Sequence, residues 1–354
     1  MFRLNYLLLF CLFTVPLSSR EKETFRVMFW NVENLFDTER DSLKQDEEFT
    51  PASMRGWNTG RYKKKMADVS RVITAVGEWE PPALVGLCEV ENDKVLHYLT
   101  RYSPLKSHGY QYVMTESQDL RGIDVALLYQ KDKFRLLGHN HIRTDLGINE
   151  RPTRDILHVT GLAPTKDTLD VMVVHFPSRS GGERESEPKR LLVAQRLRNA
   201  VDSLIAVRQE ARVIIMGDFN DYPENRSIRE VLGVKLLGET SDKDALYHLF
   251  AHKAVGKDKD QEMHAEFSGG YGSYKYRGEW GIFDHLIVSG KLLDSSACFH
   301  TGESHAGVVR LPFLFVEDEK FGGLQPFRTY NGVRYQGGYS DHLPVRGDFE
   351  LFFD

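Results

Sequence analysis

The chain has 354 residues, of which 41% are hydrophobic and 27% are charged, and its formal net charge is −5. This composition is typical of a globular protein and excludes an intrinsically disordered chain, which would have fewer apolar residues. The negative charge argues against a protein that holds nucleic acid mainly through a broad basic face, but not against an enzyme with local positive charge beside a cleft.

The N-terminus has the pattern of a secretory signal. Arg3 is followed by an apolar stretch up to Leu17 and then by two serines. A cationic start, a short apolar stretch and small residues predict a signal peptide over residues 1–19. The alternative is a membrane anchor, but a span needs about 20 apolar residues, and this stretch is shorter and is broken by Pro16. We therefore expect export to the periplasm or the medium and one mature domain over residues 20–354.

Four segments of the chain start as apolar, β-branched runs suited to buried strands and end in polar or ionisable side chains. They are residues 25–34, 84–91, 169–178 and 213–221. In a fifth segment, residues 281–289, the polar pair Asp284 and His285 comes before the apolar run instead. If these strands converge on one rim of the protein, we expect their polar ends to form one cleft.

An aspartate and a histidine are adjacent near the C-terminus, within residues 338–345. A carboxylate beside an imidazole can orient the histidine for phosphate chemistry. We expect this segment to join the polar strand ends. The residues that the cleft would gather are Asn31, Glu33, Glu89, His175, Asp218, Asn220, Asp284, Asp341 and His342.

These motifs, in this order, resemble the endonuclease/exonuclease/phosphatase superfamily, which includes deoxyribonuclease-I-like nucleases, abasic-site endonucleases, sphingomyelinases and inositol polyphosphate phosphatases. The resemblance extends from Phe25 to the end of the chain. It implies an α/β fold, a four-layer α/β sandwich in which two packed, mostly antiparallel sheets are flanked by helices. A helix over residues 188–208, with its apolar residues on one stripe, would cover one outer face.

Asn31 and Glu89 end two apolar strands and offer only oxygen donors, which suit a hard divalent cation. We expect Mg²⁺, with Mn²⁺ or Ca²⁺ as alternatives. The resemblance places both residues at the metal, adds Glu33 by analogy with an acid of the abasic-site endonucleases, and puts Asp341 near the metal. The cysteines lack the spacing of a zinc site.

Asp218 and Asn220 are two residues apart and share a face in extended chain. Asp218 is then placed to orient or deprotonate an attacking water, and Asn220 to hold that water or a phosphate oxygen. The alternative for this pair is an Asx-type turn. For His342, the resemblance assigns Asp284, and not the adjacent Asp341, as the partner that fixes its tautomer.

His175 is shared with deoxyribonuclease-like and sphingomyelinase-like members but not with abasic-site endonucleases, so two cleft histidines favour general phosphodiester hydrolysis. Asp124 is a candidate for orienting His175, with a turn as the alternative interpretation. Arg154 matches a family arginine that contacts phosphate, and Arg151 is its rival. Arg179 lies in a loop after His175 whose cation and amides could contact phosphate.

A basic run, Arg61 with residues 63–65, has two interpretations. It can supply local positive charge beside the cleft. The alternative, which we favour, is the solvated face of a helix whose apolar stripe begins at Met66.

The leading hypothesis for function is a secreted, metal-dependent phosphodiesterase that acts on DNA or RNA as a monomer. The second is sphingomyelinase-like or phosphatase-like hydrolysis of a phospholipid head group or a small phosphate ester. The aromatic and glycine-rich stretch of residues 302–338 could shape such specificity or touch a membrane, whereas residues 311–315 could equally form an edge strand. The third hypothesis, a phosphate-binding module without turnover, is disfavoured because no expected cleft position holds an inert side chain.

Overall fold

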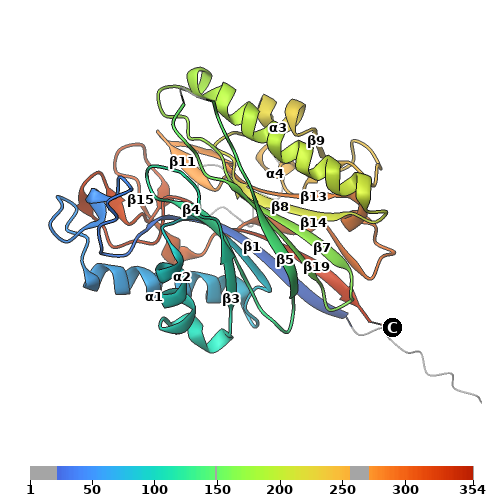
Figure 1. The fold of residues 1–354 in the computed structure, drawn as a ribbon, viewed down its shortest axis with the longest axis horizontal. Helices are drawn as coiled ribbons and strands as arrows, with labels where there is room; N and C mark the ends of the chain where they lie inside the picture. The colour runs from blue at the N-terminus through green and yellow to red at the C-terminus, as the bar shows by residue number, and fades with distance from the viewer. Residues whose placement is uncertain (1–21, 148–149, 256–270, 354) are drawn as a thin grey trace, which may run out of the picture.

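The computed structural model describes residues 22–147, 150–255 and 271–353, and the predicted signal peptide lies outside them. Two large sheets lie face to face, and helices cover both outer faces (Figure 1). The predicted four-layer α/β sandwich is thereby confirmed.

Both large sheets are mixed, and most neighbouring strands in them are antiparallel. The first sheet has, in spatial order, β14 (Phe299–Val308), β19 (Val345–Phe352), β1 (Lys22–Leu35), β2 (Leu84–Val90), β4 (Asp124–Tyr129) and β3 (Gln111–Met114). The second has β5 (Arg135–Ile142), β6 (Ile156–Leu162), β7 (Thr168–His175), β8 (Arg212–Asp218), β13 (Asp284–Ser289), β10 (Leu246–His248) and β9 (Val234–Leu236). The parallel pairs are β1 with β2, β7 with β8, and β9 with β10.

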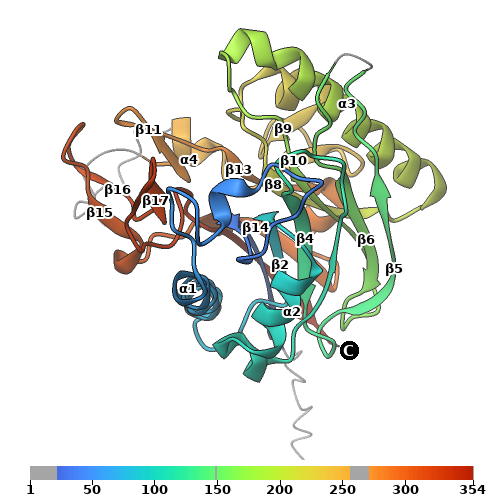
Figure 2. The same cartoon turned by 60° about the vertical axis from the view of Figure 1, so that its left-hand side comes forward.

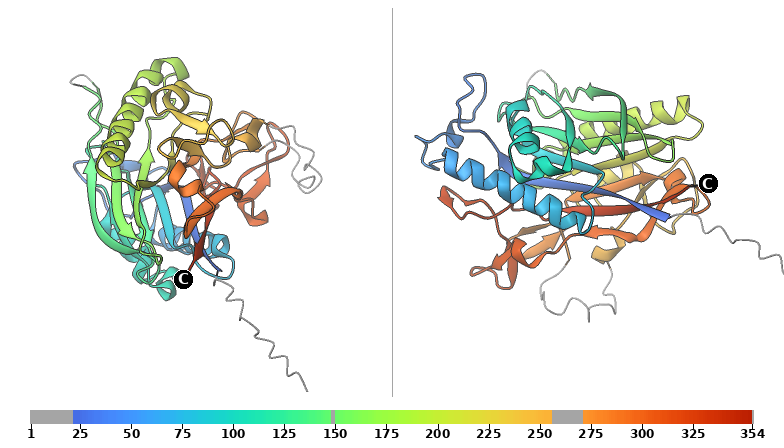
Figure 3. Two further views of the ribbon diagram at one scale, coloured as in Figure 1. Left: turned by 90° about the vertical axis from the view of Figure 1, so that its right-hand side faces the viewer. Right: turned by 90° about the horizontal axis from the view of Figure 1, so that it is seen from below.

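The core between the sheets is built from one face of each strand, because successive side chains of a strand point to opposite faces. In β1, for example, Val27 and Phe29 point into the inter-sheet core, whereas Met28 and Trp30 pack toward the helices. α1 (Thr59–Gly77) and α2 (Asp93–Arg101) cover the six-stranded sheet, and α3 (Glu183–Val207) covers the seven-stranded one (Figures 1 and 3).

The connections between strands explain why polar residues follow so many of them. α1 joins the parallel strands β1 and β2, and α3 joins β7 and β8, because parallel neighbours need a crossover connection. Both strands of each pair therefore end at the same edge of their sheet. β13 is antiparallel to β8, so β13 begins where β8 ends. This is why its polar pair precedes the apolar run.

Three small hairpins and a short helix complete the fold. The hairpins are β11 (Tyr274–Tyr276) with β12 (Glu279–Gly281), β15 (Phe315–Glu317) with β16 (Leu324–Pro326), and β17 (Tyr330–Asn331) with β18 (Arg334–Tyr335). Figure 2 shows these hairpins close to one another at one end of the sandwich, and the helix α4 (His252–Val255) lies nearby. Within the described ranges, no helix combines the length and apolar character that crossing a membrane requires.

Two local predictions differ from the structure. α3 begins at Glu183, five residues before the predicted start, because the acidic first turn stabilises the helix N-terminus ahead of Pro188. Residues 311–315 do not form one edge strand: Pro312–Leu314 is a short 3₁₀ helix, and the strand β15 begins only at Phe315.

The basic run on α1 is not simply solvated. Met66 and the rest of the predicted apolar stripe are buried, but so is Lys65, whose Nζ donates to Thr329 Oγ1 at 2.6 Å and to the carbonyl oxygen of Tyr339. Burial lowers the pKa of Lys65 to about 8. Arg61 donates to backbone carbonyls at the start of the helix. These two cations therefore hold loops together, and the solvated-face interpretation is wrong for Lys65.

Candidate active site

Three of the predicted catalytic side chains lie in one row across the seven-stranded sheet. In the strand register, His175 on β7 pairs with Asp218 on β8, and Asp218 pairs with Asp284 on β13. Register partners share a face of the sheet, and the residues two positions away on each strand belong to the inter-sheet core. The row therefore continues the inner face of the sheet beyond the end of its apolar part.

β7 and β8 approach each other closely beside this row. A Cβ atom at Gly217 would lie 2.2 Å from Val174 Cγ2 and 2.4 Å from the Val174 carbonyl oxygen. We predict that Gly217→Ala lowers the free energy of unfolding by about 1–3 kcal/mol through overpacking, as measured by urea denaturation. Gly138→Ala is the control, because its Cβ would meet no atom within 4 Å. Equal destabilisation of both variants would contradict the prediction.

Asp218 is the hub of the site and joins the two sheets. Its Oδ2 accepts a hydrogen bond from Asn31 Nδ2 at 3.0 Å, and its Oδ1 accepts the backbone N–H of Asn220 at 2.9 Å. The same Oδ2 lies 3.7 Å from His175 Nε2 and 3.8 Å from His342 Nε2. Burial and the nearby Asp284 raise the pKa of Asp218 to about 7, against the opposing effect of His342.

His342 is held as a buried ion pair with Asp284. Its Nδ1 lies 2.7 Å from Asp284 Oδ2, its ring stacks on Tyr274 with centroids 4.6 Å apart, and its carbonyl oxygen accepts from Trp30 Nε1 at 2.9 Å. Burial alone would lower the pKa of His342, but Asp284 and Asp218 outweigh it and raise the pKa to about 10. The imidazole therefore carries a proton at neutral pH, and its closest carboxylate is the one that the resemblance assigned.

The pKa of His175 is shifted in the direction opposite to that of His342. Burial, together with the positive charge of Arg154, holds its pKa well below the ordinary value, so the ring is neutral. Its Nδ1 is buried and has no hydrogen-bond partner among the described residues. Asp124 is not that partner, since its carboxylate accepts from Thr115 Oγ1 at 2.6 Å and from Ser117 N at 3.0 Å. Asp124 is instead the first residue of β4, and its carboxylate holds the loop that follows β3, so the turn interpretation is wrong as well.

Strained backbone brings the carboxylates to the same place. Glu33, Asn34, Glu89 and Asn220 have φ between 50° and 62°, a region that residues other than glycine rarely adopt. The register of β1 is irregular after Asn31, and that of β2 is irregular around Glu89. Such outliers cost about 1–3 kcal/mol each and cluster at functional sites. In this protein the strained residues lie at the rim of the sheets, where they interrupt the regular alternation of side chains along the strands.

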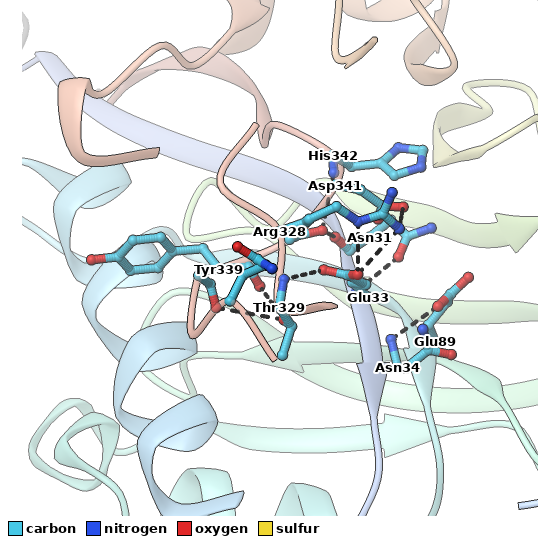
Figure 4. Close-up of polar contacts among 12 residues, drawn as sticks. Asn31, Glu33, Asn34, Glu89, Arg328, Thr329, Tyr339, Asp341 and His342 are labelled. Atoms are coloured by element: carbon cyan, nitrogen blue, oxygen red, sulfur yellow. Dashed lines mark hydrogen bonds and ion pairs between the residues drawn. The ribbon is translucent and has the colours of Figure 1, made fainter. Parts of the chain in front are cut away.

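Arg328 lies among these carboxylates, although no sequence motif predicted it at the site. Its Nη2 lies 2.9 Å from Asp341 Oδ2 and 3.3 Å from Glu33 Oε1, and the next residue, Thr329, donates its N–H to Glu33 Oε2 at 2.6 Å (Figure 4). Burial and the neighbouring Asp341 raise the pKa of Glu33 to about 7, against the attraction of Lys65 and Arg328. Glu33 is thus tied to the loop between β16 and β17.

The donor set fits a hard divalent cation. Asn31, Glu33, Glu89 and Asp341 offer only amide and carboxylate oxygens, the ligands that Mg²⁺ and Ca²⁺ prefer. Figure 4 shows Asn31, Glu33 and Asp341 close together, with Glu89 beside them. One Glu89 oxygen accepts the N–H of Asn34 at 2.9 Å, which fixes the carboxylate at the rim.

The thiol of Cys88 lies beside the site, which the positions of the cysteines in the sequence did not indicate. Single ligand atoms of Cys88, His175 and Asp218 lie within 4.8 Å of one another. Burial holds the pKa of Cys88 well above its ordinary value, so the free thiol stays protonated.

The two arginines predicted to contact phosphate are engaged by the protein itself. Arg154 is buried and donates to the carbonyl oxygen of Phe176 at 2.6 Å, with a second bond to Asp119 at 3.1 Å. Arg179 donates to the carbonyl oxygen of Asn220 at 2.8 Å and to Asp221 at 3.0 Å. Both hold the loops that follow β7 and β8, and phosphate contact by either one stays a prediction.

Arg121 is the second residue that the sequence did not indicate. Its Nη2 donates to Asn34 Oδ1 at 2.9 Å and lies 3.8 Å from Glu89 Oε1. Neither Arg121 nor Arg328 belongs to a strand-end motif, so no local pattern could have found them. The only signal was the noted aromatic and glycine-rich stretch that contains Arg328.

A profile of the endonuclease/exonuclease/phosphatase family matches residues 26–350. The chain belongs to this family. No curated protein sequence matches it. The family assignment confirms the resemblance drawn from the strand-end motifs, and the fold is that of phosphoester hydrolases.

Solved structures of the family share the fold at low sequence identity. Humanized D. rerio TDP2 with 14 mutations is 14% identical, with a TM-score of 0.54, covering 92% of this chain and 98% of that one. A mannosyl-6-phosphatase from Bacteroides thetaiotaomicron VPI-5482 is 15% identical, with a TM-score of 0.55, covering 93% and 100%. D. rerio TDP2 solved with a single-stranded DNA product is 14% identical, with a TM-score of 0.52, covering 92% and 98%.

Proposed function

We propose that this family member is an exported, divalent-metal-dependent phosphodiesterase that cleaves DNA or RNA as a monomer. The observation that carries the proposal is the arrangement around Asp218. Its carboxylate accepts a hydrogen bond from Asn31 and lies within 4 Å of two histidines, of which His342 is protonated and His175 is neutral. Export rests on the N-terminal pattern alone.

The reaction is a one-step, in-line attack of water on phosphorus. Asp218, with a pKa of about 7, accepts the proton of the water as the new P–O bond forms. The protonated His342 neutralises charge and gives its proton to the leaving oxygen as the old P–O bond breaks. The neutral His175 donates an N–H hydrogen bond to the phosphoryl group.

The cation site of the proposal consists of Asn31, Glu89 and Asp341. The fourth predicted ligand, Glu33, is left out because it is tied to the loop that carries Arg328. A bound Mg²⁺, or Mn²⁺ or Ca²⁺, supplies neutralisation of charge on the phosphoryl oxygens. Asn31 bonds Asp218 directly, so the proposed cation site lies beside the proposed general base.

Nucleic acid is the favoured substrate because the fold is shared with a TDP2 that binds a single-stranded DNA product, and because both cleft histidines are present. A small phosphomonoester is the second candidate. Two observations favour it: the fold is equally close to that of a mannosyl-6-phosphatase, and the net charge of this chain is negative. A substrate panel separates the two.

We predict that the purified protein nicks plasmid DNA or degrades RNA in the presence of Mg²⁺ and loses at least about 100-fold of that activity in EDTA. The panel also includes bis(p-nitrophenyl) phosphate, mannose 6-phosphate, sphingomyelin and inositol phosphates. A His175→Ala, His342→Ala double variant controls for contaminating nucleases. Turnover of phosphomonoesters alone would refute the nuclease proposal, and turnover that survives EDTA would refute the role of the cation.

A further inference from the structure

The arginines near the site differ in how free their guanidinium groups are. The side chains of Arg154 and Arg179 are only 7% and 18% exposed, and their donors are used by carbonyl oxygens and carboxylates of neighbouring loops. The Arg328 side chain is 41% exposed although it lies among carboxylates. Its two contacts with Glu33 are long, at 3.3 and 3.4 Å, so only the bond to Asp341 at 2.9 Å has the length of a strong charged hydrogen bond.

Glu33 is in the reverse situation. Its side chain is 4% exposed, one carboxylate oxygen accepts the Thr329 N–H, and the other faces Arg328 (Figure 4). Lys65 lies buried behind it and ties down the same loop. Because the Glu33 side chain is buried and one of its oxygens is held by the loop, little accessible surface is left on it for a cation. The geometry instead makes Glu33 the anchor of the loop that carries Arg328.

We propose that Arg328 binds the phosphate group of the substrate and that Glu33 positions Arg328 instead of holding the cation. The inference rests on the proposed phosphate chemistry of the site. A guanidinium has five donors in a planar fork that matches phosphate oxygens, and Arg328 uses few of them within the protein. A cation held by Asp341 would compete for the carboxylate that makes the strongest of these bonds, and the guanidinium would then be available to phosphate.

The decisive experiment measures phosphate and cation binding separately. Full-length protein loaded with Mn²⁺ is titrated with inorganic phosphate by calorimetry, and metal-free protein is titrated with Mn²⁺. We expect Arg328→Met to weaken phosphate binding by about tenfold to a hundredfold, the cost of one charged hydrogen-bonding group. Mn²⁺ binding should not weaken, because the variant removes a cation from an acidic site. Arg328→Lys should recover part of the phosphate affinity, since it restores charge but not the fork.

Arg334→Met is the matched control, because Arg334 is exposed on β18 in the same segment of the chain. It should change neither titration. The proposal fails if Arg328→Met leaves phosphate binding unchanged, if it weakens Mn²⁺ binding tenfold, or if the Mn²⁺-loaded wild-type protein does not bind phosphate.

Glu33→Gln and Glu89→Gln separate an anchor from a ligand. Glu89→Gln should raise the dissociation constant for Mn²⁺ at least tenfold, whereas Glu33→Gln should leave it within about threefold and weaken phosphate binding instead. Equal loss of Mn²⁺ affinity in the two variants would make Glu33 a ligand and overturn the proposal. Thermal unfolding of both variants checks that they are folded. If Glu33→Gln is unstable, the titrations of the Arg328→Met variant still test the proposal.

Turnover distinguishes this inference from the proposed function. In Arg328→Met, KM for bis(p-nitrophenyl) phosphate and for p-nitrophenyl phosphate should rise by a larger factor than kcat falls. The substrate whose KM rises more shows whether Arg328 binds the phosphate of a diester or of a monoester. A wild-type protein that binds phosphate through Arg328 but hydrolyses nothing would refute the proposed hydrolase and leave the assignment of Arg328 intact.

Discussion

Asp218→Asn should lower kcat for the substrate that the panel identifies by about 10³-fold. The substitution keeps the shape of the side chain but leaves one oxygen, which can accept only one of the two hydrogen bonds from Asn31 and Asn220. It also removes the group that accepts the proton of water. Initial rates at saturating substrate measure the effect. The variant should still fold, but its free energy of unfolding should fall by about 1–3 kcal/mol, because one of the two buried donors loses its acceptor.

Comparison with Glu89→Gln separates loss of the general base from loss of the cation. Both variants should be inactive at low Mg²⁺, but only Glu89→Gln should recover activity when the concentration of the cation is raised. Calorimetric titration with Mn²⁺ should show wild-type affinity for Asp218→Asn. An Asp218→Asn variant with near wild-type kcat would remove Asp218 from the chemistry.

The strand-end residues could be predicted from the sequence because the physics that places them is local. Continuous apolar runs predict β7, β8 and β13 as strands buried on both faces, and His175, Asp218 and Asp284 are the polar residues at their ends. The order of the motifs supplied the rest, since each parallel pair needs a helical crossover that brings its strand ends to one edge.

Arg328 and Arg121 could not be predicted in this way because tertiary contacts alone bring them to the site. Arg328 reaches Glu33 across 295 positions of sequence, in a loop without a periodic pattern. Lys65 shows the converse: its position in a basic run predicts solvent exposure, but its long stem and three donors let it cross a buried layer to Thr329. The sequence pattern of a helix predicts which of its faces is buried. Whether a lysine can be buried as well depends on hydrogen-bond acceptors that other elements supply, and the local pattern does not contain them.

Asp284→Asn should reduce kcat/KM by about 10³-fold near pH 8, because the site loses the charge that keeps His342 protonated. In the wild-type protein the pKa of His342 is raised to about 10, chiefly by Asp284 and Asp218 acting against burial. The active form is the imidazolium, so activity is retained below this pKa and falls as the pH rises through it. Without the Asp284 charge, the pKa falls and the alkaline limb of the profile moves to lower pH.

The profile of kcat/KM against pH, which reports on the free enzyme, measures this shift. A second buried Asp–His pair tests whether the shift is specific to Asp284. Asp170 in the middle of the same sheet lies 2.9 Å from His158 Nε2, and it is fully buried like Asp284. Asp170→Asn should therefore lower stability without moving the alkaline limb. If both variants lose activity in proportion to their loss of stability, and neither moves the limb, Asp284 supports the fold alone and His342 does not act through its charge.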